Sequence, residues 1–130
     1  MNTQAVFLLV AAVGLTPIAL SYGLMPQHSL SFLFGIDAQA VNVAHIFRAI
    51  MGLYLALVLF WIVGALKKQI ALSALYSLVV FMLGLALGRL LSLVVDGMPH
   101  WLLVVYFILE VGFGLVGVYM IKKSINQEIK

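Results

Sequence analysis

The chain has 130 residues, of which 65% are hydrophobic and only 8% are charged, and its net charge is +3. A water-soluble domain has about a quarter of its residues charged, so this composition excludes a soluble globule and indicates an integral membrane protein. The chain has no cysteine, which excludes disulfides, iron–sulfur clusters, thiolate zinc sites and cysteine nucleophiles.

Four apolar ranges are each long enough to cross about 30 Å of hydrocarbon as a helix, which takes about 20 residues. They are residues 4–24, 40–66, 70–95 and 99–121. We therefore predict an all-α fold, an integral membrane four-helix bundle in which residues 1–130 form a single domain. No Lys or Arg precedes the first range and no small-residue cleavage site follows it, so we interpret it as a retained span.

The connection formed by residues 25–39 is long and apolar at its centre. Its stretch SLSFLFGI suggests a segment that lies on the membrane surface or folds back over the mouth of the bundle. Asp37 is predicted to be the N-cap of the second span, because a carboxylate there accepts the first free amide hydrogens of a helix. Four aromatic residues near span ends are predicted to form interfacial belts: Tyr22, Trp61, Trp101 and Tyr119.

The lysines predict the orientation of the bundle. Lys67 and Lys68 connect the second and third spans, and Lys122, Lys123 and Lys130 follow the fourth, whereas the other two connections contain no Lys or Arg. Cytoplasmic loops are enriched in Lys and Arg, so we expect both termini to lie in the cytoplasm of a bacterial inner (plasma) membrane. Because these lysines flank membrane spans, we expect membrane lipid as a partner and no nucleic acid.

Arg89 in the third span and Glu110 in the fourth are ionisable side chains inside hydrocarbon, where a charge needs a partner. The third span runs outward and the fourth inward, and helical side chains lean toward the N-terminus of their own helix. Arg89 should therefore lean inward and Glu110 outward, between two spans joined by the short turn DGMPH. We predict an intramembrane ion pair between them. Asp96 lies about 10.5 Å along the helix from Arg89, opposite to the lean of its side chain, so we expect no direct contact.

The second span carries a further polar group, since His45 and Arg48 lie one turn apart and Arg48 leans toward the level of Asp96. Together these side chains predict an outward-facing polar cavity, with Tyr54 and Tyr106 as further lining residues. The predicted ligand-binding residues are His45, Arg48, Tyr54, Arg89, Asp96, Tyr106 and Glu110. The arginines favour an anionic or carbonyl-bearing group on a small-molecule ligand or a lipid headgroup.

Other kinds of site have no signature in this sequence. The three histidines form no His-x-x-x-His or Glu-x-x-His pair, so we expect no metal and no cofactor. A phosphate loop, a nicotinamide fingerprint and a Ser–His–Asp spacing are also absent, and we predict no catalytic residue. Gly84 and Gly88 form a GxxxG motif, which favours close helix packing and permits a homo-oligomer through small-residue faces.

The run HIFRAIMGLYLAL is followed by FMLGLALGRLLSLVVDGMP and by the glutamate of FILEVGFG. In these residues the chain resembles a family of small four-span bacterial membrane proteins, the domain of unknown function 4345. The resemblance covers most of the chain from His45 onward and rests on Arg48, Gly52, Tyr54, Gly88, Arg89, Asp96, Gly97 and Glu110. The resemblance implies that these residues act together, and it implies no activity. A looser similarity to DoxX-like proteins rests on architecture alone.

Three functions are consistent with these features. The first is binding of a small molecule or lipid headgroup in the polar cavity. The alternative is a structural or partner-binding membrane module without a ligand, in which the charges only hold helices together. The third is a membrane-embedded enzyme with Glu110 as acid or base, or a small dimeric transporter. We rank an enzyme below the other two, because an arginine opposite Glu110 favours the ionised carboxylate, which suits general-acid work poorly.

Overall fold

The computed structural model describes all 130 residues and contains five helices and no strands. The helices are α1 (Thr3–Gly23), α2 (Pro26–Phe34), α3 (Val41–Leu66), α4 (Lys68–Val95) and α5 (Trp101–Ile129). Four of them, α1, α3, α4 and α5, are long and apolar enough to cross a membrane. The predicted all-α fold with four membrane-spanning helices is confirmed.

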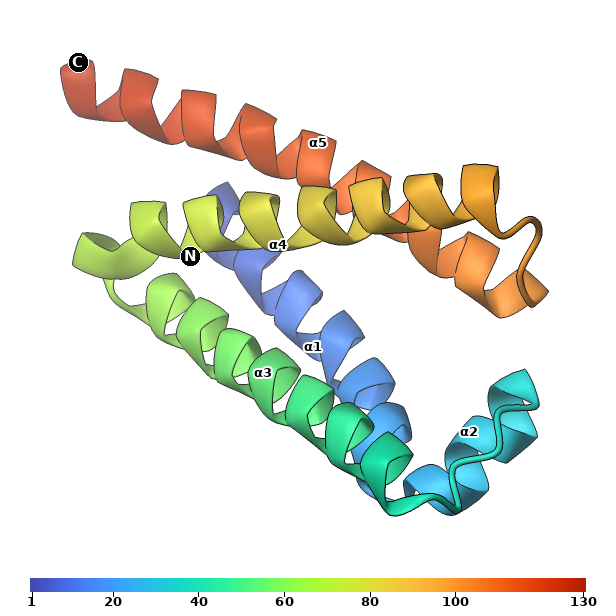
Figure 1. The fold of residues 1–130 in the computed structure, drawn as a ribbon. Helices are drawn as coiled ribbons and strands as arrows, with labels where there is room; N and C mark the ends of the chain where they lie inside the picture. Colours follow the sequence, from blue (N-terminus) through green and yellow to red (C-terminus); the bar gives the residue numbers. More distant parts are fainter.

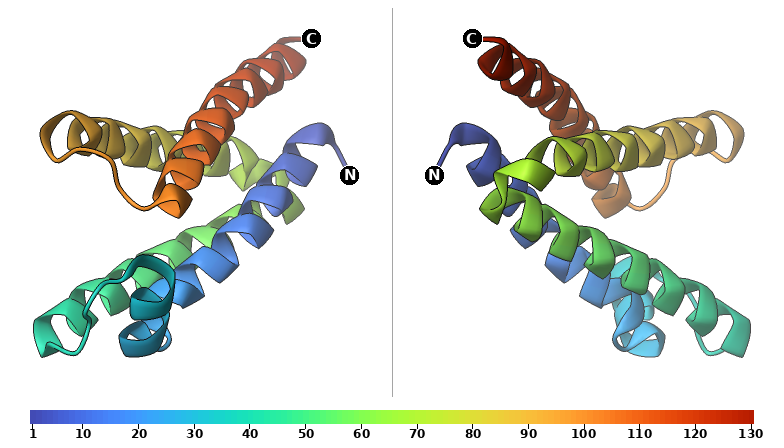
Figure 2. Two further views of the ribbon diagram at one scale, coloured as in Figure 1. Left: turned by 90° about the vertical axis from the view of Figure 1, so that its right-hand side faces the viewer. Right: turned by 90° about the vertical axis from the view of Figure 1, so that its left-hand side faces the viewer.

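The four long helices pack as two pairs (Figure 1). Helix α1 lies against α3, and α4 lies against α5, while α3 and α4 converge at the Lys67 turn that joins them. Both views in Figure 2 show the two pairs diverging away from that turn. We name the end with the Lys67 turn and both termini the turn end, and the end with α2 and residues 96–100 the loop end.

Close approach between the helices depends on isolated glycines. A Cβ at Gly23 of α1 would lie 2.5 Å from Met51 Cβ and 3.0 Å from Arg48 Cα, both on α3. A Cβ at Gly64 of α3 would collide with the Cβ of Ala74 on α4. Without these two glycines α1 and α4 would each have to move away from α3, so they determine how the helices converge.

The GxxxG motif of α4 does not pack against another helix of this chain. Gly84 and Gly88 are exposed, and a Cβ built on either would meet nothing within 4 Å. Helix α4 instead packs against Gly114 and Gly117 of α5, where Leu83 occupies the space that a Gly114 side chain would need. The expected role of the motif in close packing is therefore wrong within the chain, and both of its glycines border open space.

Two residues of the predicted aromatic belts are part of the core. Trp61 is fully buried, and its Nε1–H donates to Ser77 Oγ at 3.0 Å, which links α3 to α4 near the turn end. Tyr22 is buried as well. The expectation for these two is wrong, because neighbouring helices cover both side chains. Trp101 and Tyr119 are exposed, as side chains in a belt would be.

The connection of residues 25–39 contains an unpredicted helix, α2. It ends at Gly35, whose left-handed backbone conformation (φ 68°) is one that glycine adopts without strain. Phe34, the last residue of α2, packs edge-on against Tyr106 and His100 of the α5 side, with ring centroids 6.3 and 5.9 Å apart. The connection therefore folds back over the mouth of the bundle, one of the two expected arrangements.

Two helix ends differ from the sequence-based expectation. Asp37 does not cap α3, which begins after Ala40 without a side-chain hydrogen bond, because the Asp37 carboxylate accepts the backbone N–H of Gln39 instead. Helix α5 continues beyond the predicted span, and Gln127 in its last turns accepts a hydrogen bond from Gln4 Nε2 at 3.1 Å. This bond ties α5 to α1 at the turn end.

Candidate functional site

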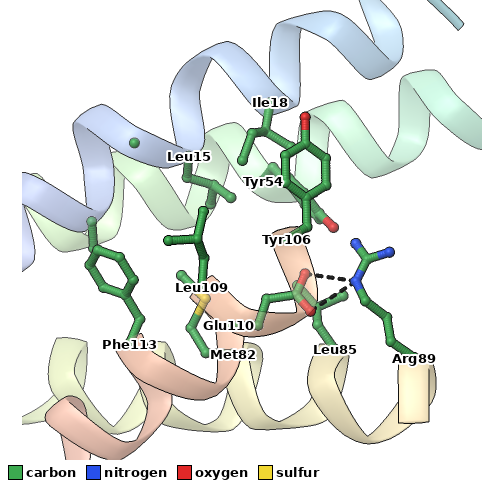
Figure 3. A pocket seen from close by; sticks show the side chains of 12 residues that line it. Leu15, Ile18, Tyr54, Met82, Leu85, Arg89, Tyr106, Leu109, Glu110 and Phe113 are labelled. Atoms are coloured by element: carbon green, nitrogen blue, oxygen red, sulfur yellow. Dashed lines mark hydrogen bonds and ion pairs between the residues drawn. The ribbon is translucent and has the colours of Figure 1, made fainter. Parts of the chain in front are cut away.

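Arg89 of α4 and Glu110 of α5 form the ion pair drawn in Figure 3. The Nε–H of Arg89 donates to both carboxylate oxygens of Glu110, at 2.9 Å to Oε1 and 2.8 Å to Oε2. Glu110 is buried and Arg89 is partly exposed. The predicted intramembrane pair is confirmed, and the opposite leans of side chains on two antiparallel helices account for it.

The pair leaves most of the Arg89 guanidinium free. A guanidinium has five N–H donors, and Glu110 engages only the one on Nε. The two Nη amino groups do not pair with the carboxylate, and Figure 3 shows them pointing away from it. The Tyr22 hydroxyl is near enough to accept a hydrogen bond from the guanidinium. The fork that arginine uses to bind carboxylates and phosphates through two parallel bonds is thus available to a second group.

Three tyrosines surround this guanidinium. The Tyr106 ring centroid lies 5.9 Å from Arg89 Cζ, within cation–π range. Tyr54 is 5% exposed, and its hydroxyl makes no hydrogen bond within the chain although it lies close to Arg89. Tyr22, 6% exposed, packs edge-on against Tyr54 at 5.7 Å and is close enough to interact with Arg89. Tyr22 is not among the predicted site residues; the signal for it is the neighbouring Gly23, whose close contact with α3 brings the end of α1 onto that helix.

Two spaces meet at Arg89. A small cavity of about 80 Å³ lies among α1, α4 and α5, with the Glu110 carboxylate in its wall (Figure 3). A groove of about 670 Å³ lies between α3 and α4 and reaches the loop end. Arg89 and Tyr54 line both, so they form part of the wall between the two. The groove falls within the range of about 300–1,000 Å³ that is usual for ligand sites.

The walls of the groove are mostly apolar. Its polar side chains are Tyr22, Tyr54, Arg89 and Ser92. Gly84 and Gly88 leave part of its α4 wall without side chains. The remaining walls carry apolar side chains of α3, α4 and α5, among them Phe47, Ile50, Leu53, Val80, Phe81, Leu93, Val104 and Phe107.

Residues 3–121 match the protein family described as Domain of unknown function (DUF4345). The chain belongs to the DUF4345 family. The match confirms the resemblance seen from His45 onward and extends it over α1. No curated protein and no solved structure matches the chain.

Three predicted site residues of this DUF4345 protein lie outside both spaces. His45 is exposed, and its side chain makes no hydrogen bond within the chain. Arg48 is exposed, and its Nη1 donates to the main-chain oxygen of Gly23 at 3.0 Å, in the last turn of α1. Asp96 is exposed and accepts a hydrogen bond from Ser92 Oγ at 2.6 Å. The expected approach of Arg48 to Asp96 does not occur, because the helix pairs that carry them diverge toward the loop end.

The DUF4345 arrangement therefore brings together four of the predicted residues, Tyr54, Arg89, Tyr106 and Glu110, and adds Tyr22. No group of three or more His, Asp or Glu side chains is placed to hold a metal ion. The chemistry that these residues offer is recognition: one cation with free donors, neutral hydroxyl groups beside it and apolar walls around them.

Proposed function

We propose that this DUF4345 protein binds an anionic or carbonyl-bearing group, of a small molecule or a lipid headgroup, in the groove between α3 and α4. The observation that carries the proposal is the Nη fork of Arg89, which no carboxylate of the chain engages and which belongs to a residue in the wall of a groove of about 670 Å³. An arginine fork is matched to carboxylate and phosphate oxygens. The Tyr54 hydroxyl adds a neutral donor beside it.

The purely structural alternative accounts for the Nε bonds to Glu110 but not for the rest of the site. A pair that only held α4 to α5 would be satisfied most fully by two guanidinium nitrogens, one for each carboxylate oxygen. Here one nitrogen serves both oxygens, and the amino groups are directed elsewhere. Low-dielectric surroundings strengthen any electrostatic interaction that these groups make, which supports a role in binding.

A thermal-shift screen of the purified protein tests the proposal, with small carboxylates, phosphate esters and ketones as probes. A ligand that binds only the folded protein stabilises it by about 2.7 kcal/mol at a hundred times its Kd, so its binding raises the unfolding midpoint. Arg89→Gln is expected to abolish that shift. Arg48→Ala is the matched control, since it removes an arginine that does not line the groove. A shift that persists in Arg89→Gln, or one that disappears in Arg48→Ala, would contradict the proposal.

We also propose that the protein is a multi-pass protein of a bacterial inner membrane with its loop end facing outward. The support is the distribution of lysines, since Lys67, Lys68 and Lys122 lie at the turn end and neither loop-end connection has a Lys or Arg. The chain has no cysteine, so single cysteines report orientation without background. A membrane-impermeant maleimide is expected to label Gln39→Cys in intact cells and Asn126→Cys only after lysis. The reverse pattern would show the opposite orientation.

A further inference from the structure

We infer that the ligand of the groove is a single-chain amphiphile with an anionic head, of the fatty-acid type, which enters between α3 and α4 from the outer leaflet. This inference rests on the proposed function and names the class of ligand. It follows from where the polar groups lie in the groove, from which sides of the groove are open and from the depth of Arg89.

The polar groups are confined to one level of the groove. Along α4 the groove runs from Val80 to Gly97, with Arg89 near the middle of that length. From Arg89 it continues about 13 Å toward the turn end, at 1.5 Å per helical residue. No charged side chain lines that deeper part, whose α4 wall consists of Val80, Phe81, Gly84 and Leu85. A small anion would fill only the level of Arg89, whereas an alkyl chain attached to it would cover the apolar walls below.

The glycine pair leaves the space that such a chain needs. A side chain on Gly84 or Gly88 would meet no atom within 4 Å, so the α4 wall is open at these two levels. The Tyr54 hydroxyl, which makes no hydrogen bond within the chain, lies beside Arg89, and both residues line the groove. A carboxylate at that point would accept from both residues, while its chain followed the glycines toward the turn end.

The groove opens sideways between α3 and α4. Leu53 of α3 and Val80 of α4 line it from opposite sides and are 57% and 71% exposed. Behind Arg89, the gap between α1 and α5 is bridged at the loop end by Phe34, which packs on both Tyr22 and Tyr106. In a membrane the open edge faces lipid, so a bilayer-dissolved molecule reaches Arg89 without leaving the bilayer.

The depth of Arg89 favours a small head over a phospholipid. Arg89 lies six residues from the end of α4 at Val95, about 9 Å below that end at 1.5 Å per residue. A carboxylate on one chain can be drawn to this level, with its chain directed toward the bilayer midplane as in the outer leaflet. A two-chain phospholipid would have to bring its larger headgroup equally far into hydrocarbon, which costs more because more polar surface is desolvated.

Photolabelling tests the inference with the whole protein in phosphatidylcholine nanodiscs. The probe is dodecanoate that carries a diazirine at the end of its chain, and labelled residues are identified by mass spectrometry. Labels are expected on the α3 and α4 walls of the groove, on the turn-end side of Arg89. Unlabelled dodecanoate is expected to compete at these residues, whereas 1-dodecanol and acetate at equal concentration are not.

Two sets of variants accompany the competition experiment. Gly84→Leu combined with Gly88→Leu fills the groove and is expected to lower labelling there about tenfold, a loss of about 1.4 kcal/mol of binding free energy. Gly112→Leu is the matched control, since that glycine of α5 also has open space around it but does not line the groove. Arg89→Gln is expected to lower labelling as strongly as the filled groove. The competition by unlabelled compounds uses the unchanged protein and does not depend on how any variant folds.

The outcomes separate this inference from the proposed function. Competition by acetate as strong as that by dodecanoate would overturn the amphiphile while leaving the anion site in place. Competition by 1-dodecanol as strong as that by dodecanoate would overturn the anionic head. Labels spread over the lipid-facing surface, with the same yield in the filled-groove variant, would overturn the groove as the binding site; a small-anion thermal shift abolished by Arg89→Gln would then still support the proposed function.

Discussion

Replacing Glu110 with glutamine is expected to lower the free energy of unfolding by about 3 kcal/mol, since removal of one partner of a buried ion pair leaves the other charge uncompensated. Glu110 is 7% exposed, and both of its carboxylate oxygens accept from the Nε–H of Arg89. The amide keeps the size of the side chain but not its charge. Unfolding of the purified protein in mixed micelles, followed by circular dichroism at increasing SDS fraction, measures the change.

A double-mutant cycle with Arg89→Gln isolates the contribution of the pair. The double variant has neither charge, so it is expected to be more stable than Glu110→Gln alone. If the losses of unfolding free energy in the two single variants simply add in the double variant, a direct electrostatic interaction between the two residues is contradicted. Tyr119→Phe, a change at an exposed side chain of the same helix, is the control and should be close to neutral.

Gly23→Ala is expected to destabilise the fold by about 3 kcal/mol, the upper part of the usual cost of overpacking a well-packed contact. The added Cβ would lie 2.5 Å from Met51 Cβ and 3.0 Å from both Arg48 Cα and Phe47 O. Main-chain atoms cannot rotate away as the tip of a side chain can, so α1 must separate from α3. The same SDS titration measures this cost.

Gly14→Ala is the matched control in the same helix. Nothing lies within 4 Å of a Cβ at Gly14, so the alanine meets no obstacle. Alanine is favoured over glycine inside a helix by up to about 1 kcal/mol, and the variant should therefore be as stable as the parent chain or more stable. Equal effects of the two changes would show that the contact at Gly23 does not limit the approach of α1 to α3.

The ion pair could be predicted from the sequence because everything that determines it is local. A short turn makes α4 and α5 antiparallel neighbours, and depth and side-chain direction then place Arg89 opposite Glu110. Tyr54 and Tyr106, which are predicted only as further lining residues, lie beside this pair. Depth along a helix is therefore readable from sequence with useful accuracy.

The predictions for His45, Arg48 and Asp96 depended on the distances between helices in the plane of the membrane. The depth of a residue along its own helix does not give those distances. Arg48 belongs to α3 and Asp96 follows α4, and the two helix pairs diverge toward the loop end. That divergence is determined by contacts between helices distant in sequence, such as the one at Gly23. From the sequence alone, a polar residue near a helix end can line a cavity or can hydrogen-bond to a neighbouring helix, as Arg48 does to α1.

Glycine and aromatic patterns failed for a related reason. The GxxxG spacing of Gly84 and Gly88 marks a smooth helix face but not what covers that face, and in this chain nothing covers it. Gly23, without any motif, makes the closest contact with main-chain atoms. Likewise an aromatic residue near a span end suits the interface or the core equally well, and the position of neighbouring helices placed Trp61 in the core.

The convergence of α3 and α4 at a single end has a mechanical consequence. Two contacts hold α3 and α4 together near the turn end: the hydrogen bond between Trp61 and Ser77, and the close contact of Gly64 with Ala74. From there the two helices diverge toward the loop end. The width of the groove therefore depends on the angle between α3 and α4. A mismatch between bilayer thickness and the hydrophobic length of a helix changes the tilt of membrane helices. We therefore expect the thickness of the surrounding bilayer to affect how far the groove opens.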